Sequence, residues 1–174
     1  MDNYFTILGL EPAIKIDLEN LSDQHKRLAS ESHPDNQGDE DHYKLINTAY
    51  AHLRTPSKRL YHLMTLHEIE YNKRGTVSNN LMDLFMSTAQ ILQDTDAFLR
   101  KKSATTSALG LALLEGESQQ FQELLGNQIE LIEQEQVSTL ENTEDINKLE
   151  DPARDLAFLE KWQAQLKERY ASLF

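Results

Sequence analysis

Residues 17–53 read DLENLSDQHKRLASESHPDNQGDEDHYKLINTAYAHL. Asp17 is a good N-cap for a first helix, and Pro34 must end that helix because proline disfavours helical geometry in the residue before it. The acids at 39–41 suit the start of a second helix. One stripe of residues recurs at helical spacing in each helix: Leu18, Leu21, His25 and Leu28, then Tyr43, Ile46, Ala49, Tyr50 and Leu53. The stretch therefore predicts two antiparallel helices joined by an exposed loop over 33–38.

The rest of the chain also has helical rather than strand spacing, so the predicted fold class is all-α. Residues 4–8 form a short helix, and Pro56 opens a fourth helix in the first half. The polar stretch 71–79 marks a domain boundary, which divides the chain into 1–75, with net charge −3, and 76–174, with net charge −9. Helical stripes in the second part predict a C-terminal three-helix bundle, although 103–118 does not show where its middle helix begins.

Composition excludes several classes of function. The 174 residues contain no cysteine, which excludes a disulfide framework, a thiol nucleophile and thiolate ligation of zinc or of an iron-sulfur cluster by this chain. The 29 acidic residues against 17 basic ones give a net charge of −12, which disfavours binding to nucleic acid or anionic lipid. No apolar run approaches the ~20 residues that span a bilayer. We therefore expect a cytoplasmic protein without a membrane or nucleic-acid partner.

The loop of the predicted hairpin contains the sequence His33-Pro34-Asp35. Proline fixes its own φ and restricts its neighbour, so a histidine and a carboxylate are displayed in a fixed relation. Such a loop can present these groups to a partner but does not enclose a substrate. A bare tripeptide of this kind is also ordinary loop chemistry, so its meaning depends on the surrounding sequence.

The surroundings resemble a J-domain, the module by which a co-chaperone activates a DnaK-type ATPase chaperone. The resemblance covers about residues 3–70 and includes the aromatic first helix, the basic pair Lys26-Arg27, the tripeptide, and Ile46-Asn47 with Ala49-Tyr50. Three further stretches, MDNYFTILGL, INTAYAHLRTPSKRLYHLMTLHE and RDLAFLEKW, resemble HscB-type iron-sulfur co-chaperones, whose second domain is a three-helix bundle.

The resemblance implies a protein that is not an enzyme and needs no cofactor or metal of its own. It implies that residues 1–75 stimulate ATP hydrolysis by a DnaK/HscA-type chaperone, while 76–174 deliver an IscU-like iron-sulfur cluster scaffold protein. Carried over by position, the chaperone-binding residues are Lys26, Arg27, His33, Pro34 and Asp35. A carboxylate on a rigid loop can accept charge-assisted hydrogen bonds from a partner arginine, and the basic pair can steer toward an acidic surface.

Three positions depart from the family pattern. His25 stands where an aromatic or large apolar residue is usual, Ser32 replaces a tyrosine, and Asn36 replaces a lysine. A loop with these residues is less basic and less supported by its neighbours. We expect weaker or more salt-sensitive docking on the chaperone.

The family's scaffold-binding patch is apolar and exposed. Its positions correspond to Leu81, Met82 and Phe85 on the first bundle helix and to Phe158 on the last. Helical spacing alone favours a core position for Leu81 and Phe85. Phe158, by contrast, falls off the stripe of Leu156, Leu159, Trp162 and Leu166, so it is a candidate contact.

Three other interpretations stay open. The chain could be a general J-domain co-chaperone for other clients, or a degenerate J-like structural protein whose loop no longer activates a chaperone. A metal-dependent hydrolase would need His33, Asp35 and a third ligand such as His42. All six histidines lie in 1–75, but none of their spacings matches a known metal motif, so we expect no metal site.

Overall fold

The structure is a computed structural model that describes residues 2–33, 39–72 and 74–174. All of the regular structure in these ranges is helical, which confirms the all-α prediction. The helices are α1 (Tyr4–Ile7), α2 (Leu18–Glu31), α3 (Glu40–Leu53), α4 (Pro56–Leu66), η2 (Asn79–Leu81), α5 (Met82–Ala104), α6 (Ala108–Glu141), η3 (Ile146–Lys148) and α7 (Glu150–Ser172). None of the helices within these ranges is long and apolar enough to cross a membrane.

The helix starts of the first half follow the sequence signals. The Asp17 carboxylate accepts bonds from the backbone N–H groups of Glu19 and Asn20 at 2.9 and 3.2 Å, as an N-cap does. Asp39 caps α3 in the same way, through the N–H of Asp41. Pro56 occupies the first turn of α4, where its missing N–H has no partner to lose.

The middle helix of the second half, α6, begins at Ala108, so Gly110 lies inside it. Its start is stabilised by Ser107, whose hydroxyl accepts a bond from the N–H of Gly110 at 3.0 Å. This is the side-chain pattern of a helix N-terminus. Ser107 is therefore the residue that marks the start of α6. The sequence alone did not distinguish it from the other polar residues of 103–118.

The chain forms two compact units, and their division differs from the one expected. One unit comprises 1–75 together with 139–157, and the other comprises 76–138 together with 158–174. The expected boundary after residue 75 assigns 139–157 to the second domain. In the structure, Leu149, Ala153 and Leu156 are fully buried in the core of the first unit. Their apolar side chains explain why the start of α7 groups with α1–α4.

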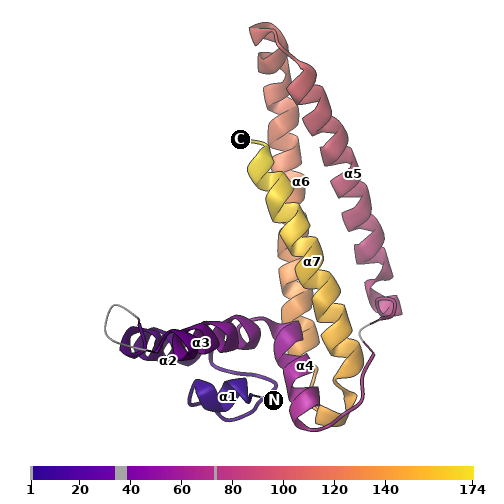
Figure 1. Cartoon of the computed structure of the whole chain (residues 1–174). Helices are drawn as coiled ribbons and strands as arrows, with labels where there is room; N and C mark the ends of the chain where they lie inside the picture. The colour runs from indigo at the N-terminus through magenta and orange to yellow at the C-terminus, as the bar shows by residue number, and fades with distance from the viewer. Residues whose placement is uncertain (1, 34–38, 73) are drawn as a thin grey trace. The chain divides into compact units, whose positions relative to one another are not determined.

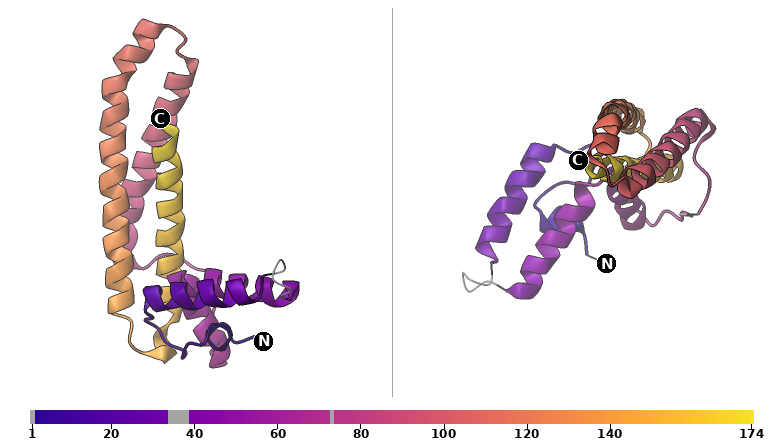
Figure 2. Two further views of the ribbon diagram at one scale, coloured as in Figure 1. Left: turned by 90° about the vertical axis from the view of Figure 1, so that its left-hand side faces the viewer. Right: turned by 90° about the horizontal axis from the view of Figure 1, so that it is seen from above.

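In the first unit α3 is the central helix, since α1, α2 and α4 all pack against it. Figures 1 and 2 show α2 and α3 side by side along most of their length. The buried core comes from α1 to α4 and the start of α7, and it consists of Phe5, Leu8, Leu21, Ile46, Ala49, Leu53, Leu60, Leu63, Met64, Leu149, Ala153 and Leu156.

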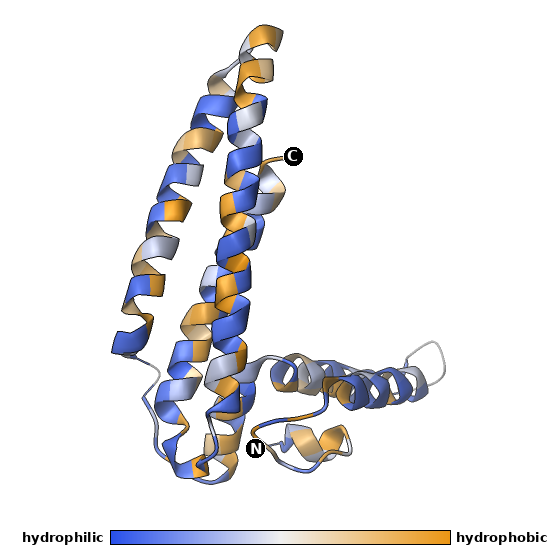
Figure 3. Cartoon of the chain, turned by 180° about the vertical axis from the view of Figure 1, so that it is seen from behind, coloured by the Kyte–Doolittle hydropathy of each residue, from blue (hydrophilic) through white to orange (hydrophobic). Residues whose placement is uncertain are grey.

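The second unit is built from α5, α6 and the later part of α7, as the bundle prediction requires. Its buried core comprises Val77, Leu81, Phe98, Leu114, Leu125, Ile132, Leu159, Trp162, Leu166 and Leu173. Apolar and polar turns alternate along α5 and α6 in Figure 3, as in helices with one buried face.

The short helix α1 is anchored to the first unit by its side chains and by one buried histidine. Phe5 and Leu8 are fully buried, and the N–H of Tyr4 donates to Nε2 of His62 at 3.1 Å. Accepting this bond requires a neutral imidazole whose proton is on Nδ1. Burial lowers the pKa of His62, and the neighbouring His52 lowers it further. The docked state of α1 is therefore coupled to a neutral His62.

We expect the chain to lose stability as the pH falls below about 6.5. The ordinary pKa of histidine, near 6.5, applies to His62 in the unfolded state, and the folded-state pKa lies below it. The stabilisation due to neutral His62 is complete above about 6.5 and is lost as the pH falls toward the folded pKa, because the unfolded state binds the proton more tightly. Thermal unfolding at pH 7.5 and 5.5 measures this loss.

The variant His62→Phe should have a smaller decrease in melting temperature between the two pH values than the parent chain. His42→Asn, which replaces an exposed histidine, should behave like the parent. An equal pH dependence in the parent and in His62→Phe would show that His62 is not the group responsible.

Candidate functional site

The α2–α3 hairpin is held together by a polar contact that we call the hairpin clasp, made of His25, Asn47 and Tyr50. Nε2 of His25 lies 2.8 Å from Oδ1 of Asn47, and the His25 ring stacks on Tyr50 with centroids 4.0 Å apart. The Asn47 amide nitrogen donates to the carbonyl oxygen of Tyr43 at 3.0 Å, which leaves its oxygen facing His25. Nε2 of His25 is therefore the donor, and the clasp fixes the register of the two helices.

His33 lies two residues after Glu31, the last residue of α2, and is half-buried. Its ring meets the Tyr43 ring edge-on, with centroids 5.2 Å apart and planes at 76°. The preceding residue, Ser32, is buried, and its N–H donates to the carbonyl of Leu28 at 3.0 Å. His33 is thus held against α3 at the start of the loop. Pro34 and Asp35, with Asn36, lie outside the described residues.

The basic pair lies on the exposed face of α2, and each cation has a carboxylate partner on its own helix. Lys26 Nζ is 3.4 Å from Asp23, and Arg27 Nη1 is 3.0 Å from Glu31. Arg27 also donates to the side chain of Gln24 at 2.9 Å. Exposed pairs of this kind are weak, so a partner can replace them at little cost. Lys26 and Arg27 are accessible, but they form part of a surface of mixed charge.

The structure gives His25 and Ser32 definite roles. The His25 imidazole supplies both a stacked ring and a hydrogen bond that an apolar residue could not make, so this position supports the hairpin. Weaker or more salt-sensitive docking on the chaperone stays a prediction. Ser32 is buried, and its backbone extends the hydrogen bonding of α2 by one residue. Both residues therefore serve the hairpin rather than its outer surface.

The four expected scaffold-binding residues all lie in the second unit but differ in exposure. Leu81 is only 2% exposed and belongs to the core, which corrects its assignment to an accessible patch. Met82 is 40% exposed and Phe85 is 38% exposed, so the core position that spacing favoured for Phe85 is also wrong. Phe158 is half-buried.

Two of these rings lie against one tryptophan. The centroid of the Phe85 ring, on α5, is 5.4 Å from the centroid of the Trp162 ring. The centroid of the Phe158 ring is 5.9 Å from that of Trp162. Met86, which is 61% exposed, follows Phe85 on α5 and was missed by the sequence analysis. Phe85 and Met86 lie three and four residues after Met82, so all three side chains lie on the same side of the helix. We call Met82, Phe85, Met86 and Phe158 the aromatic patch.

The metal-dependent hydrolase has no support in the described part of the chain. No three side chains of histidine, cysteine, aspartate or glutamate gather there in a way that could hold a metal ion. His42 is exposed on α3, and Asp35 lies outside the described residues. The proposed set of His33, Asp35 and His42 is thus not seen as a site.

Comparisons with known proteins agree with this geometry. Residues 3–62 match the family model of the DnaJ domain. The co-chaperone protein HscB homolog of Aeromonas salmonicida is 26% identical over 99% of this chain and 98% of that protein. The homolog of Shewanella loihica is 26% identical over 99% of both chains. The homolog of Neisseria meningitidis is 34% identical over an alignment of 73 positions that covers 37% of this chain and 44% of that protein.

Residues 3–62 are a DnaJ domain, and the chain is similar along its whole length to HscB co-chaperones. The DnaJ match spans α1, α2, α3 and the beginning of α4, and so includes all five positions expected to contact a chaperone. The similarity to the HscB homologs continues through the second unit. The fold is also that of the chaperone HscB from Vibrio cholerae, with a TM-score of 0.59 and 21% identity over 99% of this chain and 100% of the other.

Proposed function

We propose that this HscB-type chain is a co-chaperone that stimulates ATP hydrolysis by a DnaK/HscA-type chaperone and delivers an IscU-like iron-sulfur cluster scaffold protein to it. The observation that carries the proposal is the DnaJ match over 3–62, which coincides with a clasped hairpin that has exposed cations on α2 and a histidine at its end. The relatives named HscB are similar along the whole chain, which supports a role for both units.

In this proposal the chaperone supplies the catalytic site, and this chain supplies only docking contacts. Lys26 and Arg27 exchange their intrahelical carboxylates for carboxylates of the chaperone, a trade of exposed ion pairs that is nearly neutral in energy. Specificity then comes from the His33-Pro34-Asp35 segment, which begins two residues after the end of α2, the helix that the clasp fixes. Because α2 also carries Glu19, Asp23 and Glu31, the chaperone surface must itself be mixed in charge.

The scaffold is proposed to bind the aromatic patch of the second unit. Partly exposed aromatic and methionine side chains are typical of the centres of protein interfaces. Phe85 and Phe158 gain additional buried area when a partner covers them, and Trp162 provides a fixed floor beneath both rings. The patch therefore offers contact area without ordering a mobile segment.

Carrying both surfaces on one chain couples the two events. A scaffold bound to the second unit is held near the chaperone whenever the first unit is docked, which raises its effective concentration there. Hydrolysis, and with it tight binding of the client, then occurs when cargo is present.

The change His33→Gln should abolish stimulation of ATP hydrolysis in a single-turnover assay with a DnaK-type chaperone. Glutamine keeps hydrogen-bonding capacity but loses the imidazole that meets Tyr43 edge-on. Melting followed by circular dichroism should change only slightly, because His33 lies at the end of the hairpin and outside the core clusters.

The matched control is His42→Gln, which makes the same chemical change at an exposed position of α3 and should stimulate normally. Full stimulation by His33→Gln would contradict the docking role. A parallel loss of melting temperature and stimulation would instead assign His33 to the fold.

The change Phe85→Ala should weaken binding of a purified IscU-like scaffold by about tenfold or more, the loss of an interface hot spot. Since Phe85 is 38% exposed, the free energy of unfolding should fall by about 1–2 kcal/mol, less than the ~3–5 kcal/mol of a fully buried phenylalanine. Isothermal titration calorimetry and urea unfolding measure the two effects.

Leu131→Ala is a suitable control because Leu131 is 50% exposed on α6, outside the aromatic patch. It should bind the scaffold normally. Absence of scaffold binding by the parent chain, with normal stimulation of the chaperone, would favour a J-domain co-chaperone that serves other clients.

A further inference from the structure

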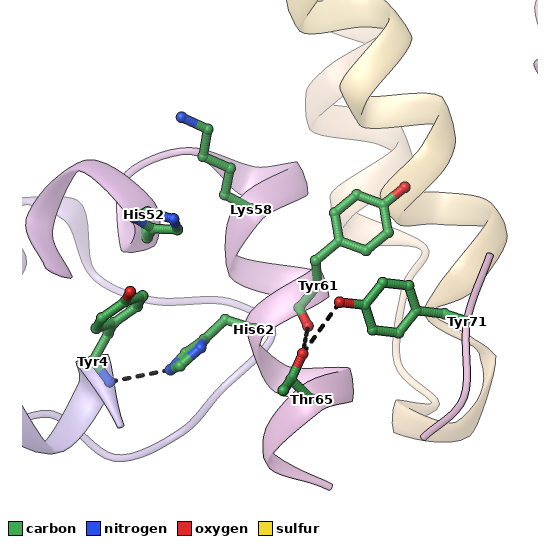
Figure 4. Close-up of a pocket in the computed structure, with 7 residues that line it drawn as sticks. All are labelled: Tyr4, His52, Lys58, Tyr61, His62, Thr65 and Tyr71. Atoms are coloured by element: carbon green, nitrogen blue, oxygen red, sulfur yellow. Dashed lines mark hydrogen bonds between the residues drawn. The ribbon is translucent and has the colours of Figure 1, made fainter. Parts of the chain in front are cut away.

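A pocket of about 240 Å³ lies in the first unit, away from the docking residues on α2. We call it the tyrosine pocket. Figure 4 shows its seven lining side chains, which come from α1, α3, α4 and the segment after α4. They are Tyr4, His52, Lys58, Tyr61, His62, Thr65 and Tyr71. No residue of α2 lines it, so the proposed chaperone contacts do not use it.

Aromatic rings form two walls of the pocket. On one side Tyr4 stacks on His62, with centroids 4.4 Å apart, and lies 4.8 Å from His52. On the other side the rings of Tyr61 and Tyr71 are 5.2 Å apart. A planar group can pack between such walls, since offset and tilted ring contacts are favourable.

Hydrogen bonds fix the walls in place before any ligand arrives. The N–H of Tyr4 donates to His62, and the hydroxyl of Thr65 lies 2.9 Å from the carbonyl of Tyr61 and 3.2 Å from the hydroxyl of Tyr71. Figure 4 shows these bonds on both sides of the pocket. A pocket with fixed walls binds small molecules without a large ordering cost.

The pocket is lined by basic rather than acidic side chains, although the chain as a whole has a net negative charge. No aspartate or glutamate is among the lining residues, whereas Lys58 and His52 are. Lys58 forms no ion pair with any residue in the described ranges, although many other lysines and arginines there do. It also lies in the first turn of α4, where the helix dipole adds positive potential. An anion is therefore the complementary ligand.

We propose that the tyrosine pocket binds a small aromatic carboxylate, with the ring between the tyrosine walls and the carboxylate on Lys58. The volume supports a ligand of about one ring, since pockets for drug-sized molecules measure roughly 300–1,000 Å³. His62 takes no part as a charged group, because it accepts the bond from Tyr4 in its neutral form. Nδ1 of His62 is buried and has no hydrogen-bond partner among the described atoms.

Two-dimensional NMR of the full chain, titrated with benzoate at pH 7.5, tests the proposal. We expect saturable shifts of the Tyr4, Tyr61 and Tyr71 ring signals with a Kd of about 1 mM. Benzyl alcohol, which has the ring without the charge, and acetate, which has the charge without the ring, should each bind about tenfold more weakly.

Two lysine variants separate specific binding from general attraction. Lys58→Met keeps a side chain of similar length but removes the charge, and it should weaken benzoate about tenfold while leaving benzyl alcohol unchanged. Lys44→Met, at an exposed lysine of α3 paired with Glu40, should bind like the parent. Non-saturating shifts, shifts centred on other residues, or equal weakening by both variants would overturn the proposal.

Discussion

The contact between the His25 ring, the Asn47 amide and the Tyr50 ring joins α2 to α3, and the proposed docking surface depends on it. The exposed cations of the proposed docking surface, Lys26 and Arg27, lie on α2, while α3 is the central helix of the first unit. A polar contact of defined geometry fixes register more sharply than apolar packing, because its donor and acceptor have one good alignment. The contact therefore sets where Lys26, Arg27 and His33 lie on the core of the unit.

The two units differ in where their core residues come from and in how much aromatic area they leave exposed. The first unit, with short helices, completes its core with Leu149, Ala153 and Leu156 from a distant part of the chain. The second unit has long helices and keeps aromatic area at its surface, where Phe85 and Phe158 lie against Trp162. The proposed docking on a chaperone would thus use charged and loop residues, and the proposed binding of a scaffold would use partly exposed rings.

Local signals in the sequence were sufficient for the helices, and non-local packing explains what they missed. Asp17 and Pro56 mark helix starts through chemistry that acts within one turn, so both could be predicted. The grouping of 139–157 with the first unit and the partial exposure of Phe85 depend on contacts between distant segments. Helical spacing did indicate the burial of Leu81, and it was the family resemblance that placed this residue in an exposed patch. The tyrosine pocket likewise combines residues from 4 to 71 that share no motif.

The most direct test of this account is a double-mutant cycle on the hairpin clasp, using His25→Ala, Asn47→Ala and the double variant at pH 7.5. Native-state hydrogen exchange of the α3 amides gives the free energy of opening of the first unit in each chain. The account predicts that the two changes are coupled by about 1 kcal/mol, as residues in direct contact are. Additive effects within about 0.3 kcal/mol would show that His25 and Asn47 act independently, and would contradict the clasp as the basis of the docking surface.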